Sequence, residues 1–137
     1  MKIYTTNYFN TFILVAADCP VLTGEVPPYR GDTKSAANIQ YELIINNPYR
    51  YTSDDVLFQV FALKNNIEEK DRESAREQFF AKGQACFRTS PLTKRYGWGV
   101  HFDGEGRMAI YSFSSAAYEM FALDTSLKVI RAMKSSR

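Results

Sequence analysis

The sequence comprises 137 residues, 45% of them hydrophobic, and carries a net charge of +2. A chain of this length and apolar content can bury one core but not two, which predicts a single domain over residues 1–137 and excludes a chain that is disordered throughout. No apolar run reaches the roughly 18 residues of a membrane span, and nucleic-acid-binding modules show a stronger basic excess, so neither membrane nor nucleic acid is an expected partner.

The first predicted element is a buried strand over residues 11–16. This segment is short, apolar and rich in β-branched side chains, which suits a strand better than a helix of that length. Residues 17–34 then contain three prolines and two glycines, and their backbone preferences exclude regular structure. We expect a long loop there, which either wraps the core or serves as a lid or partner surface.

Two amphipathic helices are predicted next, each with a polar N-terminal cap. Ser35 is the expected cap of a helix that ends at Asn47, just before a proline. A second helix follows Thr52, and the carboxylates of Asp54 and Asp55 complement the positive end of its dipole. The same pair could form an acid/base dyad or bind a metal, but adjacent helical side chains point about 100° apart, so capping is preferred.

A peripheral helix and a β-hairpin are predicted in the second half of the chain. Residues 68–82 are highly charged with few apolar contacts, and Gly83 is the expected C-terminal cap of this helix. The clearest strand signal is a hairpin over residues 96–113 around a glycine-rich turn. The alternation of its first strand predicts two faces. One face carries Tyr96, Trp98, Val100 and Phe102, and the other carries Gly97, Gly99 and His101.

The last predicted elements are less regular. Ser114 or Ser115 can cap a short helix that runs through Leu123, and residues 126–133 fit a strand or a helix almost equally, with a slight preference for a strand. Together the elements predict an α+β fold. An antiparallel sheet, centred on the 96–113 hairpin and joined by the first strand, is covered by three or four helices.

Several short blocks along the chain form a recognisable pattern. They are Thr11-Phe12-Ile13, Asp18-Cys19-Pro20, Gly24-Glu25-Val26-Pro27-Pro28, Asn47-Pro48-Tyr49, Tyr51-Thr52-Ser53-Asp54-Asp55-Val56 and Ser90-Pro91-Leu92-Thr93-Lys94-Arg95-Tyr96-Gly97-Trp98-Gly99. With these blocks the chain resembles, over nearly its whole length, a family of small bacterial proteins classed as a domain of unknown function. The resemblance implies a bacterial, cytoplasmic, single-domain protein, and it brings no activity, substrate or catalytic residue.

Candidate binding residues are concentrated between residues 88 and 101. Arg88, Lys94 and Arg95 can neutralise a phosphate or carboxylate, and Ser90 adds a hydroxyl donor. His101 shares its strand face with two glycines, which leave room for a ligand or another backbone. This pattern predicts a non-enzymatic binding domain whose partner is an anionic small molecule with a flat group. The alternative interpretation is a basic loop that leads into a hairpin, with the glycines admitting a packed helix or strand.

The charge distribution agrees with an anionic partner for the second half of the chain. Residues 1–81 carry eight basic and eleven acidic side chains, whereas residues 82–137 carry nine and four. The alternative interpretation is that two solvated faces of the protein differ modestly in charge by chance.

The thiols and the imidazole raise an enzymatic alternative. A cysteine activated by histidine is a competent nucleophile, so Cys19 or Cys86 with His101 could serve a small hydrolase or transferase. The two cysteines lack CxxC spacing, and a domain of this size needs no disulfide, so we expect reduced thiols and a cytoplasmic protein. A structural zinc site needs four ligands, which these residues do not supply. No metal and no cofactor are expected.

Overall fold

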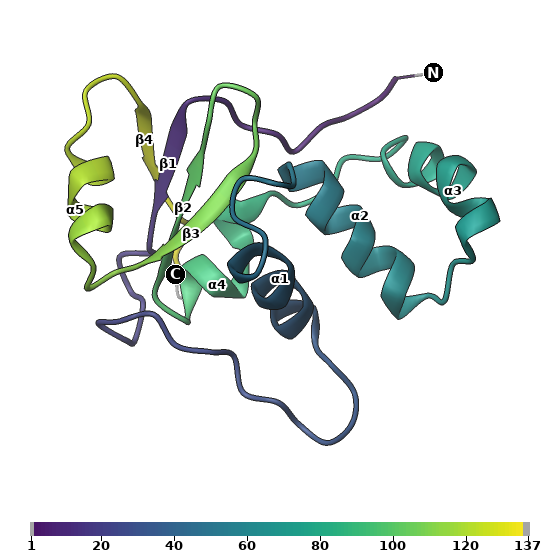
Figure 1. Cartoon of the computed structure of the whole chain (residues 1–137), viewed down its shortest axis with the longest axis horizontal. Coiled ribbons are helices and arrows are strands. Elements are labelled where there is room, and N and C mark those ends of the chain that lie inside the picture. Colours follow the sequence, from purple (N-terminus) through teal and green to yellow (C-terminus); the bar gives the residue numbers. More distant parts are fainter. Residues whose placement is uncertain (1, 136–137) are drawn as a thin grey trace.

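The computed structural model describes residues 2–135 and shows a sheet with helices on both faces (Figure 1). The strands are β1 (Thr11–Leu14), β2 (Trp98–Phe102), β3 (Met108–Ser112) and β4 (Lys128–Arg131). The α-helices are α1 (Ala36–Ile45), α2 (Ser53–Lys64), α3 (Arg72–Phe79), α4 (Pro91–Lys94) and α5 (Ala116–Ala122), with short 3-10 helices η1 (Glu69–Asp71) and η2 (Phe87–Thr89). No helix in this part of the chain is long and apolar enough to cross a bilayer.

The four strands form one sheet in the order β3-β2-β1-β4. β3 pairs with β2 and β2 with β1 in antiparallel fashion, while β4 runs parallel to β1. The α+β prediction is therefore confirmed, and the preference for a strand near the C-terminus is correct. The parallel pair makes the sheet mixed, because α5 carries the chain across one face of the sheet between β3 and β4 (Figure 1).

The alternation predicted for β2 is confirmed from Trp98 onwards. Val100 and Phe102 are fully buried against a core that includes Ile44 of α1 and Leu92 of α4. On the opposite face α5 covers the sheet, and its Tyr118 packs edge-on against Phe12 of β1. The strand begins two residues later than predicted, because Gly97 has a φ of +78° and cannot continue the extended backbone.

The loop over residues 17–34 covers the core on the side of Trp98. The indole Nε1 donates a hydrogen bond to the carbonyl of Glu25, whose own amide donates to the carbonyl of Tyr96. Gly24 lies so close to the indole that a Cβ atom there would meet the ring at 2.8 Å. This first half of the loop therefore wraps the core. The indole is partly buried, between this loop and Tyr41 of α1, whose ring centroid lies 5.5 Å away.

The predicted N-terminal caps are present. Ser35, Thr52 and Ser115 each accept a hydrogen bond from a backbone amide in the first turn of α1, α2 and α5. The predicted cap at Gly83 is wrong, because α3 ends at Phe79 and the aromatic Phe80 takes the C-cap position. The predicted basic loop before the hairpin contains η2 and α4, because Ser90 followed by a proline starts a helical turn.

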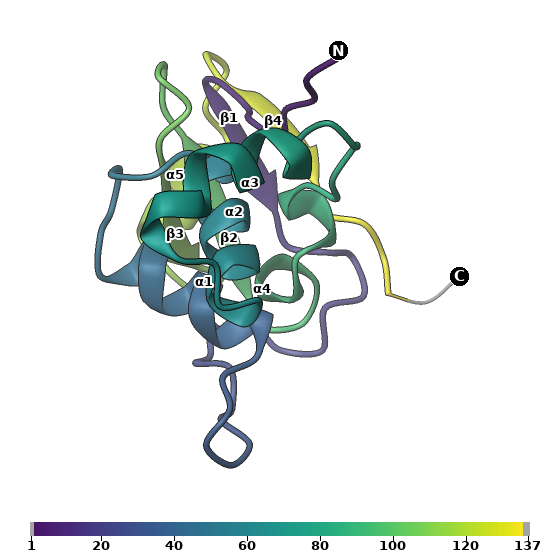
Figure 2. The same ribbon diagram turned by 90° about the vertical axis from the view of Figure 1, so that its right-hand side faces the viewer.

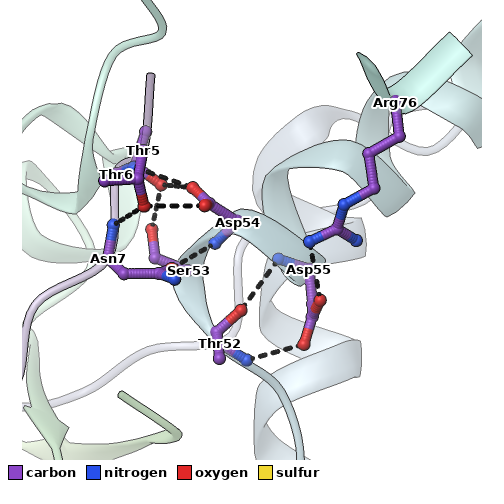
Figure 3. A network of polar contacts seen from close by, with 8 residues as sticks. All are labelled: Thr5, Thr6, Asn7, Thr52, Ser53, Asp54, Asp55 and Arg76. Carbon is purple, nitrogen blue, oxygen red and sulfur yellow. Dashed lines mark hydrogen bonds and ion pairs between the residues drawn. The ribbon is translucent and has the colours of Figure 1, made fainter. Parts of the chain in front are cut away.

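Asp54 and Asp55 have different roles at the start of α2 (Figure 3). Asp55 completes a capping box with Thr52 and pairs with Arg76 of α3 at 3.0 Å. Asp54 is 9% exposed and accepts hydrogen bonds from the hydroxyl of Thr5 and from both the amide and the hydroxyl of Thr6. Asp54 thus anchors the N-terminal segment to the domain. The local capping pattern does not predict this tertiary contact.

Candidate functional site

Arg88 contributes to the edge of the sheet. Its Nε donates a hydrogen bond to the carbonyl of Arg131 at 2.9 Å, and its own carbonyl accepts from the amide of Met133. These bonds join η2 to the end of β4 and to the residues that follow it. The guanidinium is thereby oriented towards the backbone of the C-terminal strand.

Ser90 and Lys94 bracket the short helix α4. Ser90 is 5% exposed, caps the helix and donates a hydrogen bond to the side chain of Gln40 at 2.7 Å. Lys94 is the last residue of α4 and is half-buried. The Ser90 hydroxyl is therefore committed to a contact between α4 and α1.

His101 lies on the face of the sheet that α5 covers. Its ring stacks on Phe121 with centroids 4.1 Å apart, and its Nδ1 shares a 2.8 Å hydrogen bond with the hydroxyl of Tyr49. That hydroxyl also bonds to the hydroxyl of Tyr111. Burial lowers the pKa of His101 and raises the pKa of Tyr49. The imidazole is thus held among aromatic side chains.

The buried imidazole gives a prediction for solution titration. His101 is the single histidine of the chain, so its NMR resonance is unambiguous, and we expect a pKa below the ordinary value of about 6.5. The nearby carboxylates of Asp103 and Asp124 oppose the shift, but burial is the larger effect.

The same shift sets the sign of the pH dependence of stability. The unfolded chain binds the proton more readily than the folded one. The stability that depends on neutral His101 is therefore complete above about pH 6.5 and is lost as the pH falls through the lower folded pKa. As the pH falls over this window, the denaturation midpoint of His101→Gln should decrease less than that of the unmodified protein. A folded pKa at or above the ordinary value would contradict the prediction.

Arg95 lines a pocket. This pocket of about 340 Å³ lies between the loop before α1, the first turn of α1 and the end of α4. Besides that first turn, its walls include Pro28, Arg30, Thr33, Pro91, Arg95 and Tyr96. The loop that supplies Arg30 and Thr33 projects beyond α1 (Figure 2). We call this cavity the arginine pocket.

The arginine pocket is electropositive. Within residues 2–135 the side chains of Arg30 and Arg95 have no hydrogen-bond or ion-pair partner. The first turn of α1 carries no acidic residue, so no side chain there offsets the positive end of the helix dipole. Ser35 accepts from the amide of Asn38, while the first amides of the helix have no carbonyl of their own helix within reach.

Comparison with known proteins places the chain in a family without giving it an activity. Residues 3–137 match the family described as "Family of unknown function (DUF6157)". The chain belongs to this family. The resemblance seen in the sequence blocks is thereby confirmed. No curated protein and no solved structure matches the chain. The function of this DUF6157 protein must therefore be argued from its own geometry.

Arg30 and Ser35 line the arginine pocket but are not among the site residues predicted from the sequence. Arg30 lies in the proline-rich loop, and the sequence identifies Ser35 as a helix cap. A signal was present, because the helix that Ser35 caps has no acidic residue in its first turn, whereas the next helix has two. An uncompensated helix N-terminus with an arginine a few residues before it favours an anion.

The cysteines of this DUF6157 chain have partners other than His101. Cys86 shares a 3.1 Å hydrogen bond with the hydroxyl of Tyr8, whose pKa is raised to about 12, chiefly by burial. Tyr8 packs on Phe102, on the face of the sheet opposite His101. Cys19 packs against the hydrophobic clusters. In the described residues no group of three or more His, Cys, Asp or Glu side chains could hold a metal ion.

Two glycines that were expected to leave room for a ligand are in contact with the protein itself. A Cβ at Gly99 would lie 2.6 Å from the rings of both Phe12 and Tyr118. A Cβ at Gly97 would lie 2.4 Å from the carbonyl oxygen of Thr23. These glycines admit α5 and the wrapping loop, so they leave no room for a ligand at these two positions.

Proposed function

We propose that this DUF6157 protein is a non-enzymatic binding domain that holds an anionic ligand in the arginine pocket. The observation that carries the proposal is the pair of unpartnered guanidinium groups, Arg30 and Arg95, beside an uncompensated helix N-terminus. A phosphate or carboxylate there gains charge-assisted hydrogen bonds, and the arginines give up no ion pair with the protein to make them.

The lining of the arginine pocket also supports a ligand with a flat group. The phenol ring of Tyr96 and the rings of Pro28 and Pro91 provide rigid apolar walls. Guanidinium groups bind planar or tetrahedral oxyanions through two parallel hydrogen bonds, which fixes orientation as well as charge. The lining residues found in the described chain include no histidine, cysteine or carboxylate. The pocket therefore supports binding more directly than catalysis.

The proposal predicts saturable binding of a small phosphate monoester. Methyl phosphate is a suitable probe, followed by titration calorimetry and by the rise in melting temperature that a native-state ligand must cause. Arg95→Ala and Arg30→Ala should each weaken binding by tenfold or more, because a hydrogen bond to a charged group contributes about 1.5–3 kcal/mol. Raising the salt concentration should also weaken it.

A matched control separates the pocket from overall charge. Arg107→Ala removes the same charge from the hairpin turn, where the exposed guanidinium lies 3.5 Å from the carboxylate of Glu105. Methyl phosphate binding to Arg107→Ala should be unchanged, and the loss of this exposed ion pair should cost little stability. Equal losses in the Arg95→Ala and Arg107→Ala variants, or an unmodified protein that binds no methyl phosphate, would contradict the proposal.

A further inference from the structure

A second pocket adjoins the arginine pocket. It has a volume of about 500 Å³ and lies between α1, the end of α2 and the loop before α1. Its apolar lining comes from Ile39 and Leu43 of α1 and Leu63 of α2. We call it the leucine pocket. Leu63 is 46% exposed, which leaves apolar area for a ligand to cover.

The two pockets lie next to each other along α1. Thr33 lines both of them, so the two pockets meet at this residue. Ala36 lines the arginine pocket, while Ile39 and Leu43 line the leucine pocket. These three residues are spaced at i, i+3 and i+7 and therefore form one stripe on the helix surface.

The charged side chains of the leucine pocket, unlike Arg30 and Arg95 of the arginine pocket, already have hydrogen-bond partners within the protein. Lys34 forms an ion pair with Glu42 at 2.7 Å, and the Nζ of Lys64 donates to the carbonyl of Lys34. The side chain of Asn47 donates to the carbonyl of Leu43. The hydrogen bond to Lys34 and a second one from Tyr29 lower the pKa of Glu42, so this carboxylate stays charged and engaged. What remains for a ligand is apolar surface.

We propose that the two pockets form one site for a single-chain anionic amphiphile, with a phosphate or carboxylate head in the arginine pocket and an alkyl chain in the leucine pocket. The inference rests on the proposed function, because it needs the head group to bind Arg30 and Arg95. Each pocket lies within the range of about 300–1,000 Å³ that small-molecule sites occupy. Hydrogen bonds from Tyr29 and Lys34 to Glu42 hold the loop before α1 in place before a ligand binds.

Alkyl phosphates test the inference with the head group kept constant. Octyl phosphate, used below its micelle concentration, should bind at least tenfold more tightly than methyl phosphate, since each methylene group removed from water strengthens binding roughly fourfold. Leu63→Gln should remove most of this gain, measured as the ratio of octyl phosphate affinity to methyl phosphate affinity. The matched control is Leu123→Gln, which alters a leucine that is 81% exposed at the end of α5.

The outcomes separate the two proposals. If methyl phosphate binding depends on Arg95 but octyl phosphate binds no more tightly, the amphiphile is excluded and the anion site stands. If no alkyl phosphate binds, both proposals fail. A neutral octyl glucoside that binds as tightly as octyl phosphate overturns the inference, as does a gain that survives Leu63→Gln. Binding to phosphatidic acid vesicles without binding of monomeric octyl phosphate would indicate a membrane surface and would likewise overturn it.

Discussion

Replacing Gly97 by alanine is expected to lower the free energy of unfolding by about 3 kcal/mol, the sum of a backbone cost and a packing cost. The residue has a φ of +78°, which an L side chain adopts only with strain. The new Cβ would also lie 2.4 Å from the carbonyl oxygen of Thr23. Because the obstructing atom belongs to the backbone, relief requires moving the loop that wraps Trp98.

Gly31 provides the matched control for Gly97. It has a similar φ of +68° but nothing within 4 Å of its Cβ position. Gly31→Ala should therefore show the backbone cost alone, about 1 kcal/mol. Chemical denaturation of both variants measures the difference directly. If Gly97→Ala lowers the free energy of unfolding no more than Gly31→Ala does, the loop does not obstruct a Cβ atom at position 97, which contradicts the prediction.

Replacing Asp54 by alanine is expected to cost about 3 kcal/mol, because it orphans a buried donor and removes hydrogen bonds to a charged acceptor. The amide of Thr6, a residue that is 6% exposed, has Asp54 as its hydrogen-bond acceptor. The hydroxyl of Thr6 keeps a partner in Ser53, while that of Thr5 loses its carboxylate (Figure 3). Amide exchange of Thr6 should accelerate more than that of the sheet, since the N-terminal segment loses its anchor.

Asp55 is the control, because it is the neighbouring carboxylate in the same helical turn. Asp55→Ala removes a capping interaction and a partly exposed ion pair with Arg76, for which about 1 kcal/mol is expected. Equal losses of stability in the two variants would mean that Asp54 acts as a helix cap and not as a tertiary anchor.

The local signals in the sequence predicted the elements well. Ser35, Thr52 and Ser115 cap their helices because a side-chain oxygen next to the first turn satisfies an amide whatever the rest of the fold does. The alternation from Trp98 to Phe102 predicted which face each side chain takes, because successive side chains of a strand point in opposite directions.

The candidate site was predicted in part. Arg95 was named and lines the arginine pocket, whereas Arg88, Ser90 and His101 were named with it and contact other parts of the molecule. Proximity in sequence misled here, since η2, α4 and β2 turn successive residues towards different neighbours. Arg30, which lines the same pocket as Arg95, is 65 positions earlier in the chain.

By itself the sequence determined the α+β class, the helix caps, the hairpin and the two faces of its first strand, because these depend on residues within a few positions of one another. Only the tertiary structure decided that β4 runs parallel to β1, that the glycines of the hairpin admit a tyrosine ring and a loop carbonyl, and that Arg30 and Arg95 share one pocket. Such pairings join segments distant in sequence. They are selected by how whole elements pack, and no local pattern of side chains records that choice.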